Sequence, residues 1–163
     1  MITLVLGGAR SGKSAVAERI AAGAGAPVTY VATALVDQAD ADHVARIDAH
    51  RARRPASWQT VEAGAGLVAA LEARPDGTAL VDSLGTWVTA HPDMAPDVAA
   101  LCAALTGRRG DTVLVSEEVG LGVHPASELG RRFRDVLGEV NLAVADVADE
   151  VLLVVAGRVL PLE

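Results

Sequence analysis

The chain has 163 residues, a net charge of −7 and 51% hydrophobic residues. A chain of this length can bury about 70% of its unfolded surface, so we expect residues 1–163 to form one domain with its own core. The acidic balance argues against a nucleic-acid surface as the main function. No apolar stretch approaches the roughly 20 residues of a membrane span, and residues 2–6 are too short for a signal peptide. We therefore expect a cytoplasmic protein without a membrane span.

Predicted strands and helices alternate along the chain. Strands are predicted at residues 2–6, 28–32, 59–62, 79–82, 112–116, 151–155 and 158–162. Helices are predicted at residues 13–22, 40–53, 67–73, 95–105 and 127–148. Ser127 is the expected N-cap of the last helix. The single cysteine, Cys102, excludes an intrachain disulfide and is expected to be a small core residue.

Short β-branched runs separated by helices indicate an α/β fold, with a mainly parallel sheet covered by helices on both faces. Residues Ala156 and Gly157 are expected to turn the last strand back as an antiparallel edge. In such folds ligands bind beyond the carboxyl ends of the strands. The polar residues at those ends are therefore the first places to look for a site.

The first predicted strand runs directly into GGARSGKS and then into a predicted helix. This is the GxxxxGK[ST] phosphate loop, in which backbone N–H groups surround the phosphates and the lysine reaches the outer ones. The alternative, that the glycines and serines merely make a turn, is disfavoured by the strand before and the helix after. The fold is thus expected to be P-loop NTPase-like. The residues predicted to bind nucleotide here are Gly7, Gly8, Ala9, Arg10, Ser11, Gly12, Lys13 and Ser14.

Two residues are predicted to lie near Mg²⁺. The hydroxyl of Ser14 has the position that binds the ion in phosphate loops. Asp82 ends the buried strand 79–82 and resembles a Walker B aspartate. A strand-terminal aspartate is also common as a helix cap, so the assignment depends on the phosphate loop beside it. Residues 32–34 and 116–118 follow two other strands and are candidates to line the same site.

The predicted helix 40–53 carries an imidazole between guanidinium groups. The residues that share its face by helical spacing are His43, Arg46, Ile47, His50 and Arg54. Spacing alone favours a solvated surface histidine at position 50. Adjacent cations, however, disfavour the imidazolium and tend to keep the ring neutral. A neutral His50 near a bound triphosphate is able to attack phosphorus and form a phosphoramidate.

Several motifs together resemble the bifunctional adenosylcobinamide kinase/adenosylcobinamide-phosphate guanylyltransferases of cobalamin biosynthesis. The resemblance runs in order over almost the whole chain. Its motifs are GGARSGKS (7–14), YVATA (30–34), RIxxHRxxRPxxW (46–58), TVE (60–62), LVD (80–82), EVGxGxxP (118–125), RxFRDxxGxxN (131–141) and ADEVLLVVAG (148–157). The phosphate loop alone is generic, but the segment around His50 and the EVG loop are quite specific.

The resemblance implies two reactions on one scaffold. ATP or GTP phosphorylates the aminopropanol hydroxyl of adenosylcobinamide, and GTP then guanylylates a histidine, which passes GMP to the new phosphate. The histidine of the RIxxHR pattern falls on His50, so His50 and Lys13 are the expected catalytic residues. Asp82 is expected near the nucleotide with Mg²⁺. The resemblance also assigns a guanine-nucleotide role to Ala32, Thr33, Ala34, Arg51, Ala52, Arg53, Arg54 and Glu62, and implies a homo-oligomer, a trimer.

The chain departs from the family pattern at several places. Glu117 stands where the family usually has Asn before EVG, which adds negative charge near the expected phosphate site. Ala49 replaces a second His found in some members, and Leu142 stands where Gln is common after Asn141. The segment 87–90 lacks the Asn that is frequent after Trp87, and the segment 90–95 is shortened. Two alternatives therefore stay open: a P-loop kinase with one activity, and a GTP-binding regulator without guanylyltransferase activity.

Overall fold

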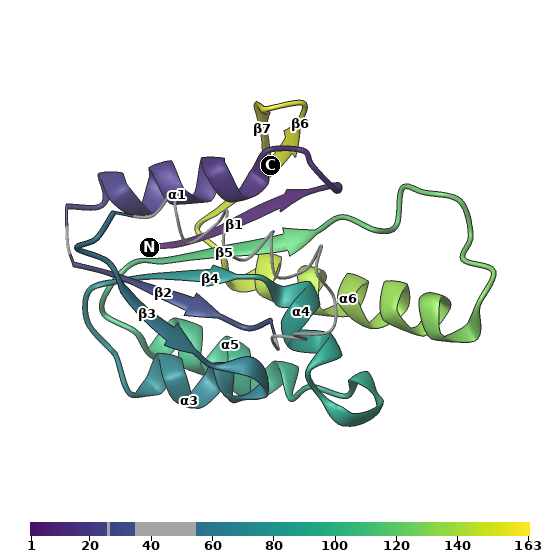
Figure 1. The fold of residues 1–163 in the computed structure, drawn as a ribbon, viewed down its shortest axis with the longest axis horizontal. Coiled ribbons are helices and arrows are strands. Elements are labelled where there is room, and N and C mark those ends of the chain that lie inside the picture. Colours follow the sequence, from purple (N-terminus) through teal and green to yellow (C-terminus); the bar gives the residue numbers. More distant parts are fainter. Residues whose placement is uncertain (26, 35–54) are drawn as a thin grey trace.

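The computed structural model describes residues 1–25, 27–34 and 55–163. In this part of the chain seven strands form one sheet with the order β3-β2-β4-β5-β1-β6-β7 (Figure 1). The strands are β1 (Ile2–Gly7), β2 (Val28–Ala32), β3 (Gln59–Glu62), β4 (Thr78–Asp82), β5 (Thr112–Glu117), β6 (Glu150–Val155) and β7 (Arg158–Leu162). The helices are α1 (Lys13–Gly23), α3 (Leu67–Glu72), α4 (Leu84–Thr89), α5 (Val98–Gly107) and α6 (Glu128–Val147), with short 3₁₀ turns at Gly64–Gly66 and Pro92–Met94.

All neighbouring strands are parallel except β6 and β7, which pair antiparallel. The α/β fold class and the antiparallel C-terminal edge strand are thus confirmed. Strand β5 lies between β1 and β4, so Gly7 pairs with Glu117, and Asp82 pairs with Val115. This order brings the carboxyl ends of β1, β4 and β5 to one edge of the sheet, immediately beside the start of α1.

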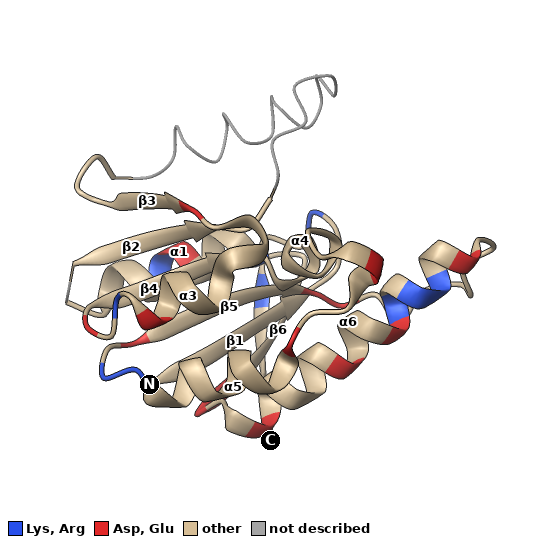
Figure 2. Ribbon diagram, turned by 90° about the horizontal axis from the view of Figure 1, so that it is seen from below, with Lys and Arg blue, Asp and Glu red and all other residues tan. Residues whose placement is uncertain are grey.

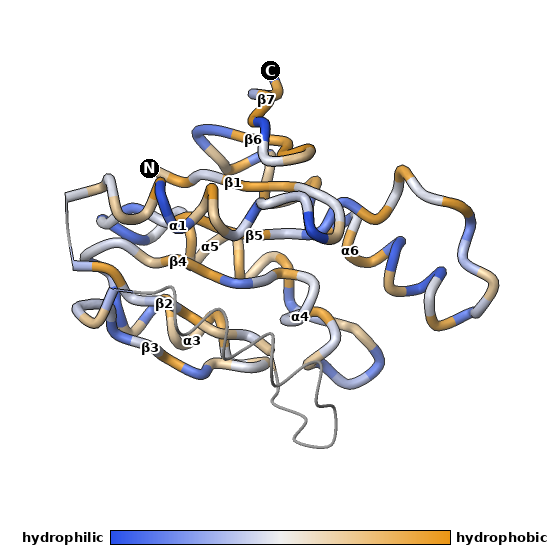
Figure 3. The backbone as a smooth tube through the Cα atoms, turned by 45° about the horizontal axis from the view of Figure 1, so that its top comes forward, coloured by the Kyte–Doolittle hydropathy of each residue, from blue (hydrophilic) through white to orange (hydrophobic). Residues whose placement is uncertain are grey.

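Both faces of the sheet are covered by helices, as the uninterrupted apolar runs of the central strands require. On one face Val16, Ala17 and Ala21 of α1 pack against β-strand residues such as Val113 and Val115. On the other face α3, α4, α5 and α6 cover a larger core. Figure 3 shows β1, β4 and β5 mainly in the hydrophobic colours. The sheet is therefore held from both sides, and its carboxyl edge is a rigid support for a site.

Helix α4 was not among the predicted elements. Its N-cap is Ser83, whose side chain accepts a hydrogen bond from the backbone N–H of Thr86 in a capping box. The helix has only six residues, too few for an amphipathic period, so no helical repeat follows the cap in its sequence. Burial of Trp87, which is 1% exposed, fixes the helix on the sheet through tertiary packing.

Helix α5 begins at Val98, whereas the sequence analysis placed its start at residue 95. The difference has a local cause, because Pro96 disfavours the helical conformation at the residue before it. Asp97 then caps the helix by accepting a hydrogen bond from the N–H of Ala100 at 2.9 Å. The predicted helix 40–53 lies outside the described residues.

Helix α6 begins as predicted, with Ser127 as its N-cap. Only its C-terminal half packs on the sheet, through Leu137, Val140 and Val144. Its N-terminal half extends beyond the sheet (Figure 1), and Figure 2 shows that the basic residues of this helix are gathered there. No helix within the described ranges is long and apolar enough to cross a membrane.

Candidate active site

The segment between β1 and α1 has the geometry that a phosphate loop needs. Gly12 precedes α1 with φ 92°, a left-handed conformation that favours glycine. A Cβ atom at Gly7 would lie 2.5 Å from Ser11 Oγ and 2.8 Å from the carbonyl oxygen of Val154. Glycine is therefore required at both ends of the loop. The predicted context of the motif, a strand before and a helix after, is confirmed.

The loop is also fixed from inside and from a neighbouring segment. Ser11 Oγ accepts a hydrogen bond from the N–H of Lys13 at 3.3 Å. The N–H of Gly157, in the turn between β6 and β7, donates to the carbonyl oxygen of Ser11 at 2.8 Å. The C-terminal hairpin thus supports the loop and limits its motion.

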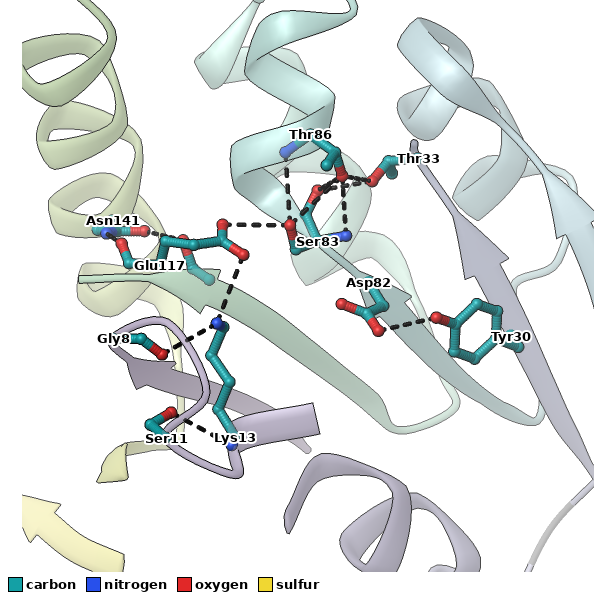
Figure 4. A network of polar contacts seen from close by, with 11 residues as sticks. Gly8, Ser11, Lys13, Tyr30, Thr33, Asp82, Ser83, Thr86, Glu117 and Asn141 are labelled. Atoms are coloured by element: carbon teal, nitrogen blue, oxygen red, sulfur yellow. Dashed lines mark hydrogen bonds and ion pairs between the residues drawn. The ribbon is translucent and has the colours of Figure 1, made fainter. Parts of the chain in front are cut away.

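The side chain of Lys13 lies at the carboxyl edge of the sheet, with 12% of its surface exposed. Its Nζ donates to the carbonyl oxygen of Gly8 at 3.4 Å and lies 3.6 Å from Glu117 Oε1 (Figure 4). The ammonium group is thus turned back over its own loop. This is the position from which a lysine reaches the outer phosphates of a bound nucleotide.

Glu117 is the last residue of β5, and residues from two other segments form hydrogen bonds with it. Ser83 Oγ donates to its Oε2 at 3.1 Å. A Cβ atom at position 85 would overlap Glu117 Oε2, so a larger residue there would require the carboxylate to shift. Asn141 Nδ2 of α6 donates to the backbone carbonyl of Glu117 at 3.1 Å. The carboxylate is consequently held between the phosphate loop and the start of α4.

Asp82 ends β4 and lies at the same edge, half-buried. The phenolic O–H of Tyr30 donates to its Oδ2 at 2.8 Å. The alternative role considered for Asp82, a helix cap, is filled by the next residue, because Ser83 caps α4. The position of Asp82 is therefore compatible with the Walker B assignment.

The segment after β2 also reaches this edge. Thr33 is fully buried, and its Oγ1 donates to the carbonyl oxygen of Ser83 at 2.6 Å. Ala32 pairs with Asp82 on one side and with Glu62 on the other. The structure therefore brings residues 32–34, Glu62 and Asp82 to the edge that carries the phosphate loop.

A family model described as "Cobinamide kinase / cobinamide phosphate guanyltransferase" matches residues 3–162 of this chain. The chain belongs to this family. The predicted pair of activities, a kinase and a guanylyltransferase in cobalamin biosynthesis, is thus confirmed at the level of the family.

Two relatives of this cobinamide kinase/guanyltransferase support the assignment. The chain is 43% identical over 171 residues to the bifunctional adenosylcobalamin biosynthesis protein CobP of Pseudomonas aeruginosa, covering 100% of this chain and 98% of that protein. It is 38% identical over 178 residues to CobU of Escherichia coli, with 96% and 97% covered. The match thus extends over nearly the full length of both relatives.

A solved structure supports the fold of this cobinamide kinase/guanyltransferase. An ATPase from the type III secretion system of pathogenic bacteria aligns with a TM-score of 0.60 and 14% identity, covering 93% of this chain. The chain spans about half of that protein, 50% of its length. At this identity the similarity concerns the fold alone, which is P-loop NTPase-like as predicted.

The two residues predicted to lie near Mg²⁺ carry oxygen ligands of the kind that this ion binds. Ser14, the second residue of α1, and Asp82 supply a hydroxyl and a carboxylate, the hard oxygen ligands that Mg²⁺ prefers. No cluster of three or more His, Cys, Asp or Glu that would hold a metal occurs among the described residues. Mg²⁺ in nucleotide sites is usually held by one or two protein ligands together with substrate phosphates and water.

Sequence analysis and structure agree on the site only in part. The phosphate loop, residues 32–34, Glu62 and Asp82 lie at one edge of the sheet, as expected. His50, Arg51, Ala52, Arg53 and Arg54 lie outside the described residues. Ser83 and Asn141, which contact Glu117, were not among the predicted site residues. Asn141 ends the motif RxFRDxxGxxN, but the contacts of both residues with Glu117 join segments that are distant in sequence.

Proposed function

We propose that this family member phosphorylates adenosylcobinamide with ATP or GTP, and then transfers GMP from GTP to the product through a GMP–His50 intermediate. The observation that carries the proposal is the phosphate loop between β1 and α1, with the Lys13 ammonium at the carboxyl edge of the sheet. The family match supplies the acceptor class, a cobinamide and its phosphate.

In the kinase step the phosphate-loop N–H groups and Lys13 would hold the triphosphate. The acceptor hydroxyl oxygen attacks the γ-phosphorus, the bond to the bridging oxygen breaks, and the nucleoside diphosphate leaves. Catalysis of this kind consists mainly of positioning and charge stabilisation. Lys13 is the residue we assign to the charge that develops on the leaving oxygens.

In the guanylyltransferase step the neutral imidazole of His50 attacks the α-phosphorus of GTP and pyrophosphate leaves. The phosphate oxygen of adenosylcobinamide phosphate then attacks the same phosphorus and releases His50, which gives adenosyl-GDP-cobinamide. An enzyme nucleophile splits the synthesis of a phosphoanhydride into two in-line displacements. We assign the guanine-nucleotide contacts to residues 32–34, 51–54 and Glu62.

Mg²⁺, when bound, would neutralise charge on the phosphates and on the pyrophosphate leaving group. Ser14 and Asp82 are the residues we assign to hold it. The hydrogen bond from Tyr30 orients the Asp82 carboxylate at the edge of the sheet. A carboxylate and a hydroxyl would suffice as protein ligands, because substrate phosphates and water usually supply the other ligands of Mg²⁺.

The test is to incubate the protein with Mg²⁺ and GTP labelled at the α-phosphate, denature it, and follow the attached label in acid and in alkali. We expect an acid-labile, alkali-stable label, as a phosphoramidate gives, that is lost in the variant His50→Ala. His43→Ala is the matched control and should keep the label. Absence of label from the wild type, despite GTP binding, would contradict the intermediate and favour a kinase or a GTP-binding regulator.

A further inference from the structure

The ion pair between Lys13 and Glu117 has a consequence for nucleotide binding. The Lys13 ammonium that is assigned to the outer phosphates lies 3.6 Å from a carboxylate oxygen of Glu117. Outer phosphate oxygens bound to the same ammonium would therefore lie within several ångströms of a fixed negative charge. Charges at such a separation, only partly exposed to water, interact appreciably. The carboxylate and the phosphates thus compete for one cation.

A hydrogen bond favours the position of the carboxylate at the phosphate site. Ser83 Oγ donates to Glu117 Oε2, and the missing side chain at Gly85 provides the space in which that oxygen lies. From β5, the backbone carbonyl of Glu117 is tied to Asn141 of α6, whose Oδ1 in turn accepts from Ser116 Oγ at 2.5 Å. Rotation of the carboxylate into solvent would cost the hydrogen bond to Ser83. This hydrogen bond therefore favours the orientation in which the negative charge remains at the phosphate site.

We propose that Glu117 is a specificity-determining residue that makes this site discriminate against nucleotides without a divalent cation. A bare triphosphate brings its own negative charge against Glu117 and competes for Lys13. A cation-complexed triphosphate carries less charge and offers metal-bound water as hydrogen-bond donors to the carboxylate. Glu117 thus weakens binding of the bare triphosphate more than binding of the cation-complexed triphosphate.

The inference rests on the proposed function, because it takes Lys13 to be the residue that binds the outer phosphates. It adds a role for Glu117, to which the proposed function assigns none. An uncharged amide at this position would not oppose a phosphate in this way. The effect is therefore expected to depend on the charge at position 117 and not on side-chain volume.

The experiment measures binding of a fluorescent GTP analogue whose α and β phosphates are joined by a methylene group, which prevents transfer of GMP to the protein. Dissociation constants are determined by fluorescence anisotropy in excess EDTA and in excess Mg²⁺. The proteins are the wild type, Glu117→Gln, Glu117→Asp, Lys13→Ala and the control Glu72→Gln. Glu72 is exposed at the end of α3, so its variant removes the same charge away from the carboxyl edge of the sheet.

We expect Glu117→Gln to bind the analogue about tenfold more tightly than the wild type in EDTA, which corresponds to about 1.4 kcal/mol. In Mg²⁺ the difference should shrink to about threefold or less. Glu117→Asp keeps the charge and should retain the metal dependence of the wild type, and Glu72→Gln should behave as the wild type in both conditions. Circular dichroism of each variant checks that it is folded.

Three outcomes would overturn the inference, and they are distinguishable. If Lys13→Ala weakens binding but Glu117→Gln keeps the wild-type ratio of the two dissociation constants, Glu117 has no such role and the proposed function stands. If Glu117→Asp loses the metal dependence as fully as Glu117→Gln does, shape and not charge is responsible. If Lys13→Ala binds as the wild type does, the assigned phosphate site is wrong and the inference fails with it.

Discussion

The chain's only lysine is placed by contacts from separate segments. Gly8 holds its ammonium from the phosphate loop, and Glu117 holds it from the end of β5. Glu117 in turn depends on the hydroxyl of Ser83, which also caps α4. The side chain of Ser83 therefore both caps α4 and orients the Glu117 carboxylate at the phosphate site.

Cys102 gives a prediction that concerns one residue. Burial raises the pKa of the Cys102 thiol, and the carboxylate of Asp146 raises the pKa further. Because the thiolate is the reactive form, we expect 5,5′-dithiobis(2-nitrobenzoate) to react with the folded protein about tenfold more slowly, or slower still, than with urea-unfolded protein near neutral pH. The absorbance of the released thiolate measures both rates. Equal rates in the folded and unfolded protein would contradict the expectation. The variant Cys102→Ser, which has no thiol, gives the background absorbance.

The position of Cys102 also corrects an expectation. The sequence predicts a small core residue, but the side chain is only half-buried, at the side of α5 where its Sγ donates to the carbonyl oxygen of Ala143 at 3.5 Å. An alanine-rich helix shows little contrast between its faces, so the pattern does not tell which small residues are covered. The packing of α6 against α5 decides this.

Among the elements, α6 is one whose start could be predicted from a local sequence signal. Ser127 Oγ accepts a hydrogen bond from the N–H of Gly130 at 3.1 Å, which satisfies one of the open donors of the first turn. The sequence predicted this cap because a cap and its partner are three residues apart. Helix α4 has an equally good cap, but its brevity left no period to recognise.

The cap of α6 leads to a prediction for this element. Replacing Ser127 by Ala should lower the free energy of unfolding by about 1 kcal/mol, because the N–H of Gly130 loses its acceptor. Urea denaturation followed by circular dichroism measures the change. Ser127→Asp is the control and should stay close to the wild type, since aspartate caps equally well. An unchanged unfolding midpoint in Ser127→Ala would show that the cap does not contribute to the global stability.

For the whole molecule, the larger core joins α6 to the sheet and to α4. Leu137 is fully buried, and its side chain lies against Gly85 of α4, which the Glu117 carboxylate also approaches. Leu142, on the same helix, is 67% exposed. The two leucines therefore share an element and differ in the packing that the tertiary structure gives them.

Replacing each of these leucines by Ala should show how much the burial of a leucine contributes to the free energy of unfolding. Leu137→Ala is expected to lower the free energy of unfolding by about 2–5 kcal/mol, through lost transfer energy and the cavity left behind. Leu142→Ala is expected to change it by about 0.5 kcal/mol or less. Urea denaturation gives both values. Similar losses in the two variants would contradict the burial of Leu137 in the core between α6 and the sheet.

By itself the sequence determined the phosphate loop, the alternation of strands and helices, the cap of α6 and the antiparallel last strand. Each of these depends on residues close together in the chain, whose preferences act locally. Only the tertiary structure decided that β5 lies between β1 and β4 and that Glu117 faces Lys13. These depend on strand order, and strand order follows from which apolar surfaces pack together across the whole sheet, a property that no local window of residues contains.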